Sequence, residues 1–350
     1  MWALTGGYGT RMATINMPSL SSKRPMIEQY ITQNPGKAIC YSGYREGQDP
    51  RQGIYPSYAE IRADLLILAE FWPVIRLYDP SQHAETTLKV IRDEGLALKV
   101  MLGADLAAEV SNPNCPWGAE FSDKTLFANR QTNSANIDRM IALANRYADI
   151  VIAVSIGNEA SVEWTDHLVP VDKLVAYARR VKSALPQPVT FCENYVPWTS
   201  KLAPLAAELD FISVHTYPVW ENVALDHALA YTQQNYRSVV DHYPNQPVVI
   251  TEAGWPTASN GRGIEPRNAS AEAQAQYCQQ LLAWTQEEKI LAFVFEAFDE
   301  PWKGSSDPLE PEKHWGLFYL DRTPKPAMQN ILERDRTRLP GVTSDAEVPT

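Results

Sequence analysis

The sequence has few cysteines and no long apolar run. Its 350 residues include four cysteines, widely spaced, with no Cys-x-x-Cys pair and no Cys/His group of the zinc-binding type. No stretch reaches the roughly 18 consecutive apolar residues of a membrane-spanning helix. We therefore expect no metal, no cofactor and no membrane partner.

Positive charge is also scarce. Lysine and arginine number 31 against 42 aspartates and glutamates, which gives a formal net charge of -11. A nucleic acid or an anionic bilayer would be repelled by such a surface, whereas a neutral or cationic ligand suits it. The charge balance predicts a protein that binds no nucleic acid, and we expect a monomer.

The chain start carries no recognisable signal peptide. Residues 1–36 lack its charged, apolar and cleavage regions, which leaves the location open between the cytoplasm and, after removal of a leader, the periplasm or exterior. The Gly-rich stretch at 6–9 suggests that part of this segment is not native. We predict an N-terminal extension over 1–36, one barrel domain over 37–338 and a solvated tail over 339–350.

Short apolar runs alternate with longer segments of helical period, which predicts repeated βα units around a parallel sheet. The predicted strands lie at 38–44, 73–79, 97–105, 150–159, 188–194, 211–218, 247–256 and 292–300. The predicted helices lie near 57–70, 81–94, 134–147, 171–184, 200–208, 222–242, 270–288 and 324–336. Eight such pairs indicate an α/β fold of the (β/α)8 TIM-barrel type. A doubly wound open sheet is the alternative, but the Gly-rich nucleotide turn it needs after the first strand is missing.

Two predicted connections are unusually long. They cover residues 106–133, after the third strand, and 301–323, after the eighth. In a TIM barrel such loops leave the carboxyl ends of the strands, where the active sites of this fold lie. We expect both loops to wall a cleft.

The predicted strand ends are rich in carboxylates. They are Asp79, Asp105, Glu159, Glu193, Glu252, Glu296, Asp299 and Glu300. Each one alone could equally be a structural acceptor for neighbouring loops. Two of them stand out, because Glu159 ends a long apolar run directly after Asn158, and Glu252 ends the run Val-Val-Ile-Thr-Glu.

These two glutamates are predicted to face each other across the barrel mouth. They are separated by 93 residues, or three βα units, which places them on the fourth and seventh strands. Glycosidic cleavage needs such a pair, one carboxyl to protonate the leaving oxygen and one carboxylate to receive the anomeric carbon. Asn158 is well placed to bond a sugar 2-hydroxyl.

Five segments, at 38–44, 75–80, 157–159, 251–256 and 298–303, resemble in order the strand-end signatures of glycoside hydrolase family 17. The resemblance covers roughly residues 37–330. It implies a retaining enzyme that cleaves β-1,3-glucan by double displacement. It also implies that Glu159 is the general acid/base and Glu252 the nucleophile.

The segment after the eighth strand extends the resemblance. Glu300 and Lys303 match a family pair that holds sugar hydroxyls or the catalytic carboxylates, and Glu296 is expected to join them at the substrate. The Pro301-Trp302 insert departs from plant members and is similar to the bacterial branch, some members of which are glucan transferases. Hydrolysis and transglycosylation, and endo and exo attack, therefore stay open. An inactive glucan-binding barrel is less favoured, since it should lack one glutamate of the pair.

Aromatic residues are abundant, with 10 tryptophans and 16 tyrosines. Those in the predicted mouth loops are Tyr41, Tyr78, Trp117, Trp164, Trp198, Tyr217, Trp220, Trp255, Trp302 and Trp315. Core packing explains most such residues. Trp255 and Trp302 flank acidic strand ends, and with Tyr217 and Tyr41 they are the candidates for contact with sugar rings.

Two further residues are expected to support the glutamates. Arg76, inside the second strand, is predicted to orient the nucleophile, and His215, at the end of the sixth, to donate a hydrogen bond near Glu252. Acyl transfer through a serine triad is not expected, because the sequence has no Gly-x-Ser-x-Gly elbow.

Overall fold

A computed structural model describes residues 27–30 and 33–338 of the chain. Eight parallel strands close into a barrel in chain order, and the last strand pairs with the first. The strands are β1 (Ala38–Cys40), β2 (Val74–Leu77), β3 (Lys99–Gly103), β4 (Val151–Asn158), β5 (Val189–Asn194), β6 (Ile212–His215), β7 (Val248–Gly254) and β8 (Ala292–Phe295). The predicted TIM barrel is confirmed, and each strand lies inside its predicted run.

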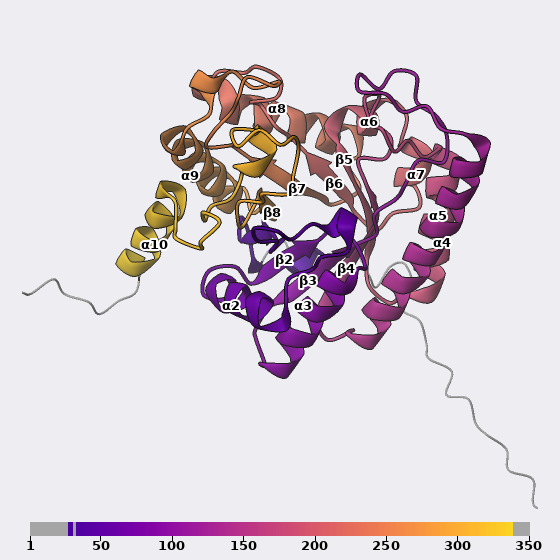
Figure 1. Ribbon diagram of the computed structural model, residues 1–350, viewed down its shortest axis with the longest axis horizontal. Helices are drawn as coiled ribbons and strands as arrows, with labels where there is room; N and C mark the ends of the chain where they lie inside the picture. Colours follow the sequence, from indigo (N-terminus) through magenta and orange to yellow (C-terminus); the bar gives the residue numbers. More distant parts are fainter. Residues whose placement is uncertain (1–26, 31–32, 339–350) are drawn as a thin grey trace, which may run out of the picture.

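Helices surround the barrel on the outside (Figure 1). They are α2 (Tyr58–Ala69), α3 (Gln82–Asp93), α4 (Asp123–Arg146), α5 (Val171–Ala184), α6 (Tyr195–Ser200), α7 (Ala203–Ala206), α8 (Leu225–His242), α9 (Ala271–Glu287) and α10 (Pro326–Arg338). Short 3-10 turns lie at η1 (Pro50–Gln52), η2 (Pro266–Asn268) and η3 (Pro311–Lys313). In the described part of the chain, no helix has both the length and the apolarity to cross a membrane.

Local sequence signals set several helix starts. Ser57 caps α2, because its Oγ accepts from the Glu60 N–H at 3.3 Å while the Glu60 carboxylate accepts from the Ser57 N–H at 2.7 Å. Ser122 caps α4 by accepting from the Thr125 N–H at 3.1 Å.

The helix predicted at 134–147 begins earlier, at Asp123, so the second half of the predicted loop 106–133 is helical. The early turns of α4 are rich in polar residues, which hid their helical period. The helix predicted at 200–208 is instead two short helices, α6 and α7, with Pro204 in the first turn of α7. Proline is tolerated in a first turn but not inside a helix, which accounts for the break.

The predicted N-terminal extension packs in part against the barrel. Ile27 is buried in the apolar cluster that includes Ile290 and Leu291, and the Gly36 N–H donates to the Ile290 carbonyl at 2.7 Å. The folded unit thus begins before residue 37. The rest of the extension, at 1–26 and 31–32, and the tail 339–350 lie outside the described residues.

Candidate active site

Glu252, on β7, lies in a cage of donors at the barrel mouth. Arg76 Nη1 donates to its Oε1 at 2.5 Å, the Tyr78 hydroxyl to the same oxygen at 3.0 Å, and the Tyr217 hydroxyl to Oε2 at 2.6 Å. Burial works to raise the pKa of Glu252, but the charges of His215 and Arg76 and the Tyr217 hydrogen bond hold it below its ordinary value. Glu252 is therefore an ionised carboxylate at neutral pH.

Glu159 directly follows β4 and is more accessible. Its side chain is 30% exposed, and its Oε1 lies 2.8 Å from His215 Nδ1. The residue has a φ of 45°, in the left-handed region that non-glycine residues rarely adopt, and its N–H donates to the Cys192 carbonyl at 2.9 Å. Such a conformation persists only where the surroundings hold it, as they often do at functional sites.

The two carboxylates face each other around His215. One oxygen of Glu159, one of Glu252 and a ring nitrogen of His215 all lie within 4.8 Å of one another. Retaining glycosidases hold their carboxyl groups about 5–5.5 Å apart, whereas inverting enzymes need about 6.5–9.5 Å to admit a water. This oxygen–oxygen spacing lies below the range that inverting enzymes need.

His215 carries positive charge between the two glutamates. Burial opposes its protonation, but the charge of Glu252 and hydrogen bonds with Cys192 and Glu159 raise its pKa to about 10. Within the described residues, Glu159, His215 and Glu252 are the one cluster with spacing suited to a metal ion. Two cationic groups, His215 and Arg76, already contact this cluster, so its chemistry does not call for a metal.

Arg76 joins the nucleophile candidate to Asn158. It is almost fully buried, and its Nη2 donates to the Asn158 amide oxygen. This bond occupies the oxygen of Asn158 and leaves its amide nitrogen as the group that can donate to a ligand. Arg76 contacts Glu252, and His215 lies 2.8 Å from a Glu159 oxygen and 3.3 Å from a Glu252 oxygen, while the roles of both residues stay predictions.

Glu296, Glu300 and Lys303 form a compact ionic cluster after β8. Lys303 Nζ lies 2.9 Å from a Glu296 oxygen and 2.7 Å from a Glu300 oxygen. Both carboxylates are fully buried, and Glu300 also accepts from Ser42 and from the Trp302 indole. The prediction that Glu296 and Glu300 contact substrate is therefore corrected, because both side chains are fully buried, whereas the Lys303 side chain remains partly exposed.

The four aromatic candidates divide into two pairs. Tyr217 is half-buried and bonds Glu252, and Trp302 is half-buried beside Tyr44. Trp255 and Tyr41 are each only 1% exposed, so their predicted contact with sugar is wrong. The Trp255 indole donates to the Asn268 carbonyl at 2.7 Å and packs on Tyr277 of α9. The Tyr41 hydroxyl donates to Asp64 of α2 at 3.3 Å.

Strand alternation explains both corrections. Side chains along a strand point to opposite faces in turn. Glu252 points into the mouth, so Trp255, three positions later, points outward to the helices. Cys40 likewise points inward, with its sulfur near the Thr251 carbonyl, and Tyr41 next to it points outward.

Two residues near the pair were not predicted as site residues. Tyr78 donates to Glu252, and Glu312, in η3, lies within electrostatic range of both glutamates. Burial raises the pKa of Glu312 to about 7, with Lys303 opposing and the charges of Glu310, Glu159 and Glu252 adding to it. The loop 301–323 was predicted to wall the cleft, but Glu312 is at no strand end and so carried no positional signal.

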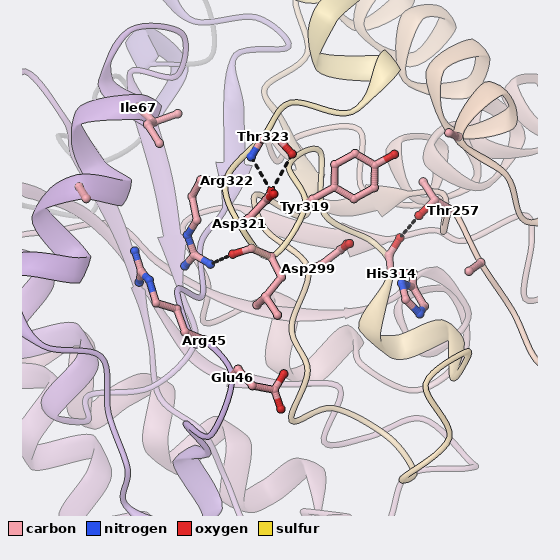
Figure 2. A pocket seen from close by; sticks show the side chains of 14 residues that line it. Arg45, Glu46, Ile67, Thr257, Asp299, His314, Tyr319, Asp321, Arg322 and Thr323 are labelled. Carbon is pink, nitrogen blue, oxygen red and sulfur yellow. Dashed lines mark hydrogen bonds between the residues drawn. The ribbon is translucent and has the colours of Figure 1, made fainter.

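A separate hollow, here called the outer hollow, is lined by α2, by the loops after β1 and β7 and by the segment after β8 (Figure 2). None of the residues that line it belongs to the glutamate pair or its cage. Several of its charged groups have partners, since Arg322 pairs with Asp64 and Asp299 with Lys325. We therefore interpret this hollow as a gap left where these loops and α2 pack together, not as a binding site.

Comparison with known proteins agrees with this geometry. The family model of the BtgE/BtgC glycoside hydrolase domain matches residues 38–316. The "Probable glucan endo-1,3-beta-glucosidase btgC" of Aspergillus fumigatus is 24% identical over 298 residues, covering 78% of this chain and 40% of that protein. The "Glucan 1,3-beta-glucosidase" of Schizosaccharomyces pombe is 28% identical over 192 residues, covering 51% of this chain and 57% of that protein. The chain thus spans about two fifths of the length of the btgC relatives.

Solved structures of similar fold point the same way. An endo-laminarinase from Formosa Hel1_33_131 has a TM-score of 0.74 and 25% identity, covering 87% of this chain and 89% of its own. A Rhizomucor miehei β-1,3-glucanosyltransferase, solved as an active-site mutant with laminaritriose, has a TM-score of 0.65 and 23% identity. The match covers 85% of this chain and 97% of that one and shows that the two share a fold.

These matches test the family that the sequence motifs predicted. The resemblance to glycoside hydrolase family 17 is confirmed, while the bacterial branch stays a prediction. Because the matched family model spans most of the sequence, the chain belongs to the BtgE/BtgC glycoside hydrolase domain family.

Proposed function

We propose that the chain is a retaining glycoside hydrolase that cleaves β-1,3-glucan by double displacement, with Glu252 as nucleophile and Glu159 as acid/base. The observation that carries the proposal is the facing pair, whose carboxylate oxygens lie within 4.8 Å of each other. The substrate is inferred from relatives with glucan glucosidase names and from the laminarinase of similar fold.

The environments of the two glutamates support the proposed roles. Glu252 is buried and accepts from Arg76, Tyr78 and Tyr217, which suits a carboxylate that must stay ionised to attack. Glu159 is partly exposed and bonds His215 alone among these groups, so it can exchange a proton with water.

The reaction follows in two steps. In the first, a Glu252 oxygen forms a bond to the anomeric carbon while the glycosidic C–O bond breaks, and Glu159 gives its proton to the departing oxygen. In the second, Glu159 takes a proton from water, whose oxygen displaces Glu252 from the same carbon. Two inversions return the β-configuration.

Glucanosyl transfer is the second candidate, because it uses the same first step. A sugar hydroxyl then replaces water as the attacking group. The Rhizomucor miehei protein of similar fold is named as a glucanosyltransferase, which keeps this reaction open for the present chain.

The substrate is tested with a panel of polysaccharides. We expect laminarin and laminari-oligosaccharides to be cleaved, while cellulose and xylan are not, as measured by released reducing ends. Product sizing at high oligosaccharide concentration separates the two reactions, since products longer than the substrate require transfer to a sugar. Cleavage of cellulose without action on β-1,3-glucan would refute the substrate assignment.

Azide separates the roles of the two glutamates. Glu252→Ala should lose several orders of magnitude in activity even on aryl glycosides, because no group remains to form the covalent bond. Glu159→Ala should still form the intermediate from an aryl glycoside, whose phenolate needs no proton, and stall at the second step.

The azide products identify each role. Added azide should restore turnover of Glu159→Ala and yield the β-glycosyl azide by attack on the intermediate. In Glu252→Ala it should occupy the vacated space and yield the α-glycosyl azide. Product NMR decides, and exchanged products would reverse the assignment.

The pH dependence tests the role of Arg76. Its charge holds down the pKa of Glu252, so activity is lost only as the pH falls through that lowered value. Arg76→Gln should therefore move the acidic limb of kcat/KM to higher pH by on the order of 1 unit or more. Arg76→Lys keeps the charge and should move it less. Equal acidic limbs in wild type and both folded variants would contradict the proposed effect.

A further inference from the structure

Two tryptophans at the barrel mouth face solvent. Trp117 is 59% and Trp164 is 39% exposed, and they are the only strongly exposed tryptophans among the described residues. Each lies in a tight turn, closed by the Gly118 N–H to the Cys115 carbonyl at 3.1 Å and by the Thr165 N–H to the Val162 carbonyl at 3.3 Å. Large exposed rings forgo the free energy of burial, so their presence here favours a binding role.

A single buried amide joins the two turns. The Asn112 side chain donates to the Glu163 carbonyl at 2.8 Å and to the Thr165 carbonyl at 2.7 Å, on either side of Trp164. The Asn112 N–H donates to the Ala119 carbonyl at 2.9 Å, which closes the loop that carries Trp117. Both rings therefore stand on a backbone that is fixed before any ligand arrives, which lowers the entropy cost of binding.

Hydrogen bonds connect the turns to the active site. Trp164 follows Glu159 by five residues, a distance of at most about 18 Å along the chain. His167 Nε2 lies 3.0 Å from the Asn158 carbonyl, and its Nδ1 lies 2.7 Å from the Asp166 carboxylate. Asp166 also interacts with the Trp117 side chain. A chain of contacts through His167 and the exposed Asp166 thus links Trp117 to Asn158, which is next to Glu159.

We propose that Trp117 and Trp164 form a platform for the sugar units on the leaving-group side of the cleaved bond, which is also where a transfer acceptor would bind. The proposal rests on the proposed function, because Glu159 protonates the leaving oxygen and so marks that side. A neutral glucan fits, since flat rings pack on the apolar faces of pyranoses and Asp166 can accept their hydroxyl groups.

Truncation of either ring tests the platform. In Trp117→Ala and Trp164→Ala, kcat/KM for laminarihexaose should fall about tenfold, the loss expected for one stacked ring. The same variants should hydrolyse an aryl laminaribioside within twofold of wild type, because its leaving group is a phenol with no sugar to place on the platform. Tyr319→Ala removes an exposed ring that lines the outer hollow instead, and it should change neither substrate.

The outcomes separate this inference from the proposed function. Unchanged hexaose kinetics in both tryptophan variants of an active enzyme would overturn the platform alone, and so would equal losses on both substrates. If the wild-type protein cleaved no β-1,3-glucan, the proposed function would fail. Binding can then be measured without catalysis, as the retardation of the protein during electrophoresis in a laminarin-containing gel. Its loss in the tryptophan variants would support the platform, and equal retardation would overturn it.

Discussion

The buried ion pair between Arg76 and Glu252 is the interaction on which the chemistry of the mouth depends. Arg76 comes from β2 and reaches across the barrel to β7, and it also bonds Asn158 on β4 and approaches His215 on β6. Removing either partner would leave an uncompensated charge in the barrel, which typically costs about 3–5 kcal/mol. The pair therefore fixes the charge of Glu252 and the positions of its neighbours together.

The need to compensate a buried charge also accounts for the contacts of other acidic residues at the strand ends. A buried carboxylate in the barrel needs a cation or several hydrogen-bond donors as partners. Glu296 and Glu300 share Lys303, and Asp299 pairs with Lys325 at 2.7 Å. Glu159 differs because it is partly exposed and held in a left-handed conformation. In our account its accessibility is what lets it take up and release a proton.

Much of the fold and the facing positions of the two glutamates could be predicted from sequence. Apolar runs of strand length gave the count of eight, and three βα units between Glu159 and Glu252 gave their facing positions. Closeness to a strand end did not give the direction of a side chain, which is why Trp255 and Tyr41 were misplaced. Glu312 lies in a loop whose path depends on tertiary packing, so no local pattern could bring it to the pair. The start of α4 was missed because its first turns face solvent and carry few apolar residues.

Covalent trapping tests the central claim most directly. A 2-deoxy-2-fluoro laminaribiosyl fluoride should form the glycosyl-enzyme and then stall, because the fluorine at C2 slows both steps while the fluoride leaving group keeps the first accessible. Intact mass should rise by one fluorinated disaccharide per chain, and peptide mapping should place it on Glu252. A label on Glu159, or turnover without any trapped species, would contradict the account.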